Sequence, residues 1–513
     1  MIHRQCANDD ISPLLYAVRG GHENIVKLLL DRGAEANVDM EQLESMLGGW
    51  WSSESTKAIT FLLEQSTDMN IGRNSLGTKL LTWAIEGMLF ELSQNLLERG
   101  IEISMTEELS STPLIAAILI ENAHLIQQLL DMGATINSTG DNFESTPLIA
   151  ACETVNATII QLLLDQGANI NPQGHSLQDT PLIVAFDTKN EPLAQQLLDL
   201  GADVNPTGDN LESSPLAAAC ESQNAAVIQT LLEKGADVSP QGRNLQCTPL
   251  IAAIETDNKQ LIQQFLDMGA NVNPTGNSLL LTPLIAACES SNVAVIQSLL
   301  EKGADVNLTG DQLDLTPLVV ACKHGNAVAI QLLLAKGADV NPTGDTSGLS
   351  PLNTACVNGN AALIQLLLEN GANANPTEDK YHFTPLATAC YDHDIGAVQL
   401  LLDKGAHINP QGSCLVTTPL MSAYDMENTE LVQVLLERGA DINMTTGYCG
   451  QSPITSVTSL GLQSMVLHAL ENGADVNKRA GRYQQTALEI AREKGRSDIE
   501  RLLLEWGAVE EQL

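Results

Sequence analysis

The sequence has few basic and few aromatic residues. Its 513 residues include 25 Lys and Arg against 63 Asp and Glu, which gives a formal net charge of −38. Proteins bind nucleic acid largely through Lys and Arg that neutralise phosphates, so this balance argues against phosphate binding along the chain and against anionic membrane surfaces. Aromatic residues make up 3% of the chain and hydrophobic residues 44%. We therefore expect a folded chain whose interior is built from Leu, Ile, Val and Ala.

Long apolar runs and several site motifs are also missing. No run approaches the about 18 apolar residues of a membrane span. The opening MIHRQCANDD has neither the basic nor the apolar region of a secretory signal. No CxxC pair, HExxH motif or P-loop occurs among the 10 Cys and 9 His. We expect a soluble protein with no metal, no cofactor and no nucleotide site.

A short motif repeats at a fixed interval of 34 residues. The Thr-Pro-Leu at Thr112 recurs, with small variations, at Thr146, Thr180, Ser214, Thr248, Thr282, Thr316, Ser350, Thr384, Thr418, Ser452 and Thr486. Aligning the Leu-Leu pairs that follow extends the series back to Lys79, Ser45 and Ser12. The chain therefore consists of about fifteen units.

Each unit predicts two short helices and a loop. In the unit that starts at Thr146, the Thr is an N-cap, Pro147 fits the first helical position, and Asn156 fits the N-cap of a second helix. Gly167 then fits a left-handed helix end. The turn-forming residues that follow predict a projecting finger loop.

A helix pair this short cannot bury its apolar face alone, so the units must stack on one another. We predict an all-α solenoid of helix-turn-helix units with finger loops, with neighbouring units about 10 Å apart. Residues 1–111 would hold an N-terminal cap and three irregular units, residues 112–485 eleven regular units, and residues 486–513 a capping unit and tail.

The chain resembles the ankyrin-repeat family. The resemblance rests on TPL at the start of the first helix, on apolar runs such as Ile330, Leu332, Leu333 and Leu334, and on GADVN at Gly201, Gly303, Gly337 and Gly473. The His that usually follows TPL in this family is replaced by Ile115, Ile149, Ile183, Ile251 and Ile285, so its hydrogen bonds between repeats must be absent or substituted. Trp50 and Trp51 stand at small-residue positions of the second unit, and with Trp83 they would fill a junction or form a ligand cage.

Six cysteines share one position of the repeat, and they are Cys152, Cys220, Cys288, Cys322, Cys356 and Cys390. Equivalent positions about 10 Å apart exceed the roughly 4.4–6.8 Å that a disulfide allows, so these should be buried free thiols in a reducing, cytoplasmic compartment. Catalysis would need a thiolate beside a His. The nearest candidates, Cys322 with His324 and Cys390 with His393, are explained by the spacing of the repeat, and we predict no enzyme.

In this family, the position seven residues after the Thr usually lies on the concave face presented to ligands. Here that position carries five carboxylates in succession and then changes to Lys323, Val357 and Tyr391; the carboxylates are Glu153, Asp187, Glu221, Glu255 and Glu289. Carboxylates about 10 Å apart would attract and orient a cationic partner. The alternative is solvated surface charge, or charge copied by duplication of repeats.

Apolar residues line the fingers just before the Thr. In the later units they occur both one and three residues before it, which places them on one side of an extended segment. The candidates for partner contact are Leu279, Leu281, Leu313, Leu315, Tyr381 and Phe383, together with Tyr391. Burial of one finger against the next is the alternative.

We therefore predict a non-enzymatic, monomeric scaffold that binds a basic, or mixed basic and apolar, protein segment, with no direct nucleic-acid or membrane contact. One alternative is an acidic mimic of nucleic acid that inhibits a DNA- or RNA-binding protein. Another is a secreted bacterial effector that binds a host protein, because residues 505–513 are similar to the tails of type IV secretion effectors. An effector would act in the host cytosol or nucleus.

Overall fold

The structure is a computed structural model, and it describes residues 12–34, 58, 75–101, 103, 112–137, 145–173, 179–207, 211–241, 245–274, 281–310, 315–342, 350–376, 383–411, 417–445 and 450–509. The chain divides into two compact units, Met1–Pro249 and Leu250–Leu513, called unit 1 and unit 2 below. Each described repeat contributes a first helix and a second helix.

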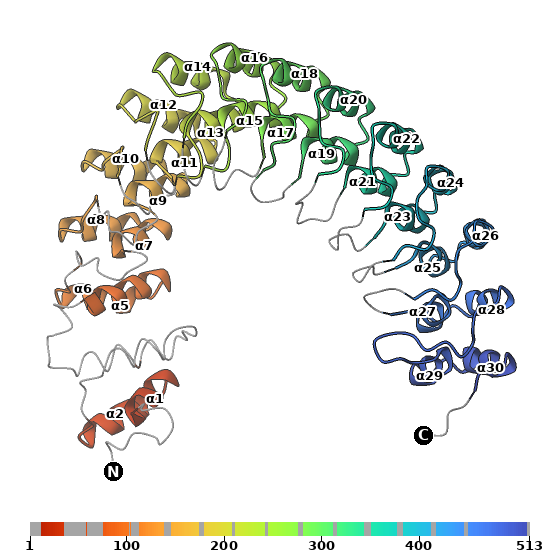
Figure 1. Ribbon diagram of the computed structural model, residues 1–513. Helices are drawn as coiled ribbons and strands as arrows, with labels where there is room; N and C mark the ends of the chain where they lie inside the picture. Colours follow the sequence, from red (N-terminus) through yellow and green to blue (C-terminus); the bar gives the residue numbers. More distant parts are fainter. Residues whose placement is uncertain are drawn as a thin grey trace. The chain divides into compact units, whose positions relative to one another are not determined.

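Unit 1 stacks its helices in two rows, one of first helices and one of second helices (Figure 1). The first helices are α1 (Pro13–Arg19), α5 (Ser75–Glu86), α7 (Pro113–Leu119), α9 (Pro147–Thr154), α11 (Pro181–Asp187) and α13 (Pro215–Glu221). The second helices are α2 (Glu23–Asp31), α6 (Phe90–Glu98), α8 (Ala123–Asp131), α10 (Ala157–Asp165), α12 (Glu191–Asp199) and α14 (Ala225–Glu233).

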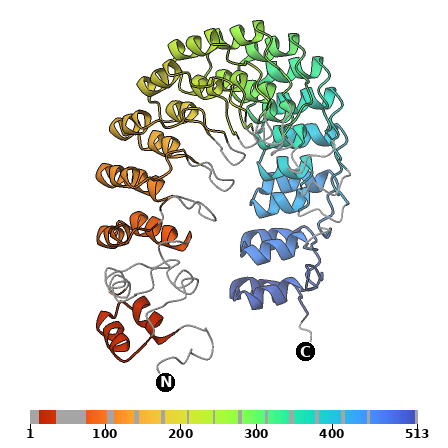
Figure 2. The same cartoon turned by 90° about the vertical axis from the view of Figure 1, so that its left-hand side faces the viewer.

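Unit 2 repeats this arrangement, and Figure 2 shows its last helices stacked as successive layers. The first helices are α15 (Pro249–Glu255), α17 (Pro283–Glu289), α19 (Pro317–Lys323), α21 (Pro351–Val357), α23 (Pro385–Tyr391), α25 (Pro419–Asp425), α27 (Pro453–Leu460) and α29 (Ala487–Glu493). The second helices are α16 (Lys259–Asp267), α18 (Val293–Glu301), α20 (Ala327–Ala335), α22 (Ala361–Glu369), α24 (Ile395–Asp403), α26 (Thr429–Glu437), α28 (Gln463–Glu471) and α30 (Ser497–Glu505).

The predicted capping residues form these helices. Thr146 Oγ1 accepts a hydrogen bond from the Ile149 N–H at 3.3 Å, and Pro147 is the first residue of α9. Asn156 Oδ1 accepts hydrogen bonds from two backbone N–H groups at the start of α10. Gly167 has φ +84°, a conformation that costs most residues energy and glycine little. The expected all-α solenoid is confirmed, and the described residues contain no strand beyond one bridge between Ala480 and Gln485.

The first helices form most of the core. In α9 every residue from Pro147 to Cys152 is buried, because neighbouring helices cover it on both sides. The second helices bury one face only, which in α10 consists of Ile159, Ile160 and Leu163. In the described ranges, no helix is long and apolar enough to cross a membrane.

An asparagine in the turn after most second helices joins one repeat to the next, whereas after α14 the same position holds Ser239. Asn171 Nδ2 donates to the Gly201 carbonyl at 3.0 Å, and the Asp203 N–H donates to Asn171 Oδ1 at 2.7 Å. The same pattern, called the Asn ladder below, is formed by Asn137 and Asn205 in unit 1, and in unit 2 by Asn273, Asn307, Asn341, Asn375, Asn409, Asn443 and Asn477. These bonds link the repeats in which the expected His is missing.

Candidate functional site

The predicted carboxylates lie in the last turn of the first helices. In unit 1, Glu153 is near the end of α9, Asp187 ends α11 and Glu221 ends α13, and all three side chains reach solvent. Because α9, α11 and α13 pack in series, the fold brings the three acids to one side of neighbouring repeats. We call this series of positions, one per first helix, the helix-end column.

Burial and mutual repulsion both act on the acids of unit 1. The pKa of Asp187 is raised from 3.8 to about 6, first by loss of hydration and then by the charges of Asp179 and Glu221. Burial also raises the pKa of Asp179, with further contributions from Glu212 and Glu153. The acids of three successive repeats therefore form one electrostatic cluster.

Sequence reasoning missed two members of this cluster, Asp179 and Glu212. They lie one and two residues before the Thr180 and Ser214 caps, in the segments that lead into the first helices. Burial raises the pKa of Glu221 as well, and the nearby Cys247 thiol partly offsets that rise. The sequence did contain a signal for these two residues, because an acid stands just before the N-cap of the first helix in both repeats.

The acids at the ends of the second helices have a different environment. A glutamine one turn earlier donates to each of them: Gln161 to Asp165 at 2.7 Å, and Gln195 to Asp199 at 2.9 Å. Gln229 likewise donates to Glu233 at 3.3 Å. These carboxylates are exposed and compensated within their own helix, and they provide a natural comparison for the helix-end column.

In unit 2, the helix-end column changes its chemistry. It begins with Glu255 and Glu289, both exposed, and continues with exposed Lys323, Val357 and Tyr391. The next residue of the column is Asp425, a carboxylate that sequence reasoning overlooked because the acidic series had already stopped. Ser456 Oγ donates to Asp425 Oδ1 at 2.7 Å, and burial raises the pKa of this carboxyl to about 6 despite that bond.

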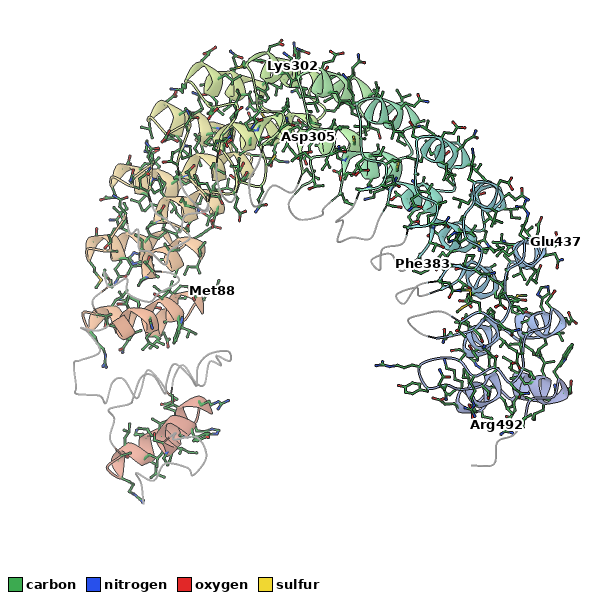
Figure 3. The ribbon with its side chains drawn as sticks, viewed as in Figure 1. Met88, Lys302, Asp305, Phe383, Glu437 and Arg492 are labelled. Atoms are coloured by element: carbon green, nitrogen blue, oxygen red, sulfur yellow. The ribbon has the colours of Figure 1, made fainter. Side chains whose placement is uncertain are left out.

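The apolar finger residues are only partly described. Leu281 and Leu315 are half-buried, whereas Phe383 is 38% exposed and Tyr391 52% exposed. Figure 3 shows Phe383 on the side of the first helices of unit 2, and Glu437 on the side of the second helices. Leu279, Leu313 and Tyr381 lie outside the described residues. In unit 1 the equivalents Leu211 and Leu245 are buried, so at those positions the finger residues belong to the core.

The six cysteines of the repeat are buried thiols. Each has an exposed fraction of 0%, and burial raises the pKa of Cys152, Cys220, Cys288 and Cys322 to about 12. Burial also raises the pKa of Cys390, and the His393 ring nitrogen lies 3.1 Å from Asn428 Nδ2. The candidate pair Cys390 and His393 thus lacks an accessible thiol. Over the described ranges, no group of three or more His, Cys, Asp or Glu is placed to hold a metal ion.

The aromatic junction of the early repeats is described at one residue. Trp83 is half-buried in α5. Trp50 and Trp51 lie outside the described residues, so both interpretations of the three tryptophans stay predictions.

Comparisons with known proteins match almost the whole chain to one kind of repeat. A family model described as "Ankyrin repeats (3 copies)" matches residues 80–174, 173–242, 239–310, 309–378, 370–446 and 420–511, and an "Ankyrin repeat" model matches residues 9–41. No curated protein matches. Among solved structures, the human ASB11 ankyrin repeat domain is 26% identical, covers 45% of this chain and 100% of its own, and has a TM-score of 0.38.

Proposed function

Because this chain belongs to the ankyrin-repeat family, whose repeats are protein–protein interaction modules, we propose that its helix-end column binds a basic segment of another protein. The acidic residues of each unit, Glu153, Asp187 and Glu221 in unit 1 and Glu255 and Glu289 in unit 2, attract and orient such a segment. Apolar residues of the fingers and of the column add desolvated contact; they are Leu281, Leu315, Phe383 and Tyr391, with Leu279, Leu313 and Tyr381 outside the described residues. The protein acts by recognition, without chemistry of its own.

The observation that carries this proposal is the unfavourable position of the acids. The C-terminal end of a helix has partial negative charge, so an acid there typically costs about 0.3–1 kcal/mol. In unit 1 the acids also repel one another, and burial removes part of their hydration. Helix stability gives no reason to keep them, whereas a bound ammonium or guanidinium group would relieve both effects.

Charge at these positions acts mainly on the rate of association. A series of like charges raises the local concentration of an oppositely charged partner, while affinity comes mostly from buried apolar contacts. Successive repeats lie about 10 Å apart, and a segment in the extended polyproline II conformation has 3 residues per turn and rises about 3.1 Å per residue, so a basic residue at every third position faces the column at a matching spacing.

Charge reversal in unit 1 tests the proposal. The variant E153K/D187K/E221K is compared with the variant D165K/D199K/E233K, which reverses the acids at the ends of the second helices. Each acid-to-Lys exchange changes the charge by +2, so both triple variants change the net charge by +6. The probe is a labelled peptide with Lys at every third position, mixed in a stopped-flow instrument at several salt concentrations.

We expect the helix-end variant to slow association at low salt by about tenfold or more and to flatten its salt dependence, while the second-helix control keeps most of the rate. The variant E255K/E289K tests the same positions in unit 2. Equal effects of both triple variants would show that net charge alone attracts the peptide, and would contradict the proposal. Competition by an oligonucleotide for a protein partner would instead favour the nucleic-acid mimic.

A further inference from the structure

Between α19 and α25, the helix-end column presents a cation, two apolar residues and an anion in that order. Lys323, Val357, Tyr391 and Asp425 are the last residues of α19, α21, α23 and α25. Lys323 is exposed, Val357 is 54% exposed and Tyr391 is 52% exposed, whereas Asp425 is half-buried. The order differs from that of the earlier repeats, where acids hold the same position.

Hydrogen bonds between repeats hold these helix ends side by side. Asn358, which follows Val357, donates from Nδ2 to the carbonyl oxygens of Cys322 at 2.7 Å and Lys323 at 2.9 Å. Asn353 Nδ2 donates to the Phe383 carbonyl at 3.2 Å, which links α21 to the segment that leads into α23. The helices α21, α23 and α25 pack in series. The four residues therefore end successive, packed first helices.

The two apolar members, Val357 and Tyr391, follow one another in the column, and Phe383 is a separate exposed apolar residue at the other end of α23. A single exposed apolar residue is ordinary on a protein surface, but neighbouring ones at a position that is charged elsewhere indicate a contact surface. Phe383, 38% exposed, lies just before the first helix that ends in Tyr391. Tyrosine and phenylalanine supply large contact area at low entropic cost, as interface anchors do.

Asp425 is the member that most needs a partner. It is half-buried, it accepts a bond from the neutral hydroxyl of Ser456, and no ion pair among the described residues includes it. A partly buried carboxylate is stabilised when a cation approaches it. At the other end of this section, on α19, the exposed Lys323 ammonium can form an ion pair with an anion of a partner.

We propose that α19 to α25 bind an extended segment of a partner protein that carries an acidic residue, two apolar residues and a basic residue, about three residues apart. The acid pairs with Lys323, the apolar residues cover Val357 and Tyr391, and the base pairs with Asp425. The spacing follows from repeats about 10 Å apart and from the polyproline II conformation, in which every third residue faces the same side at a rise of about 3.1 Å per residue. This inference rests on the proposed function, because it gives the same column a second, differently charged section.

The test uses the full chain and two labelled decapeptides, one for each chain direction: Asp-Ser-Ser-Leu-Ser-Ser-Leu-Ser-Ser-Lys and its reverse sequence. Binding is measured by fluorescence anisotropy at low salt. We expect at least one of the two to bind about tenfold more tightly than a peptide with both Leu replaced by Ser. The K323E variant should bind that peptide about tenfold more weakly than the native chain does. Replacing the Asp of the peptide by Lys should restore its affinity for K323E.

Matched controls lie on the neighbouring second helix. K336E makes the same charge change at the end of α20, and V328D places a charge at an apolar residue of α20 that is 52% exposed. We expect neither variant to weaken binding of the peptide, whereas V357D should abolish it. If both decapeptides bind no better than the Ser peptide, or if K323E and K336E act alike, the inference is wrong.

The peptide with Lys at every third position, measured on the native chain and on E153K/D187K/E221K, separates the two proposals. If that peptide binds through the acids while both decapeptides fail, only the present inference is overturned. If it fails as well, the proposed function is overturned with it.

Discussion

Replacing Asn341 by Ala should lower the free energy of unfolding of unit 2 by about 1–2 kcal/mol. Asn341 Nδ2 donates to the Gly371 carbonyl at 2.9 Å, and the Asn373 N–H donates to Asn341 Oδ1 at 2.7 Å. A hydrogen bond contributes a net of about 0.5–1.5 kcal/mol, so two contribute about 1–3 kcal/mol. Both bonds are exposed to water, which replaces lost partners, and we therefore expect the lower half of that range.

The measurement is urea unfolding followed by circular dichroism, combined with hydrogen exchange of single amides. Because contacts in a repeat protein run only between neighbours, the loss should be local. The Asn373 amide, which Asn341 accepts in the native chain, should exchange faster in the variant. Amides several repeats away should exchange at unchanged rates.

Two variants serve as controls. Asn370 Nδ2 donates to the Leu366 carbonyl at 2.8 Å within its own repeat, so N370A removes one bond without loosening the link between repeats. N341D keeps the acceptor oxygen and loses the donor, so it should lose part of the stability that N341A loses. If N341A unfolds like N370A and the Asn373 amide stays protected, the Asn ladder does not couple the repeats.

Two further predictions concern the titratable groups. The pKa of Asp187 is raised from 3.8 to about 6 by burial and by the charges of Asp179 and Glu221. The folded state therefore holds this proton more tightly than the unfolded state. The free energy of unfolding should fall as pH rises from about 4 to about 6, and it should stay lower above that. D187N should therefore raise the urea midpoint near pH 7 and leave it almost unchanged near pH 3, whereas an equal gain at both pH values would contradict the pKa shift. Cys390 has an exposed fraction of 0% and a raised thiol pKa, so it should react with Ellman's reagent only as fast as the chain unfolds. Peptide mapping can follow the labelling of this residue. Labelling of Cys390 in the folded protein at the rate of a free thiol would contradict its burial.

Much of the fold follows from local chemistry in the sequence. Thr146, Asn156 and Gly167 are read directly as caps and a helix end, because those roles depend on residues within a few positions of each other. The face of α10 is less easily assigned. Leu162 and Leu164 look like core residues in the sequence, yet both are half-buried, and Ile159 is buried instead. Which apolar residue turns inward depends on the neighbouring repeats, which a single helix does not specify.

The helix-end column could be predicted as a position but not as a complete set. A fixed count from the Thr finds Glu153 and Asp187, and the same count would have found Asp425, had the series been followed past Tyr391. The contribution of Asp179 could not be counted, because it approaches Asp187 only through the fold of the segment before Thr180. The Asn ladder could not be predicted either. Turn propensity alone explains an Asn at this position, whereas the bonds of its side chain join residues about one repeat apart.

The Asn ladder also bears on how such a chain lengthens. Each ladder asparagine bonds to the turn of the following repeat, and where that turn holds the next asparagine, as at Asn171 and Asn205, one 34-residue segment carries both the bonding side chain and the backbone groups that receive the preceding one. An in-frame duplication or deletion of one such segment leaves every junction chemically matched. Asn477 makes the same two bonds, donating to the Gly507 carbonyl and accepting from the Val509 amide. Gene-level copying can thus change the number of binding positions while side-chain substitution changes their charge, and the two can evolve separately.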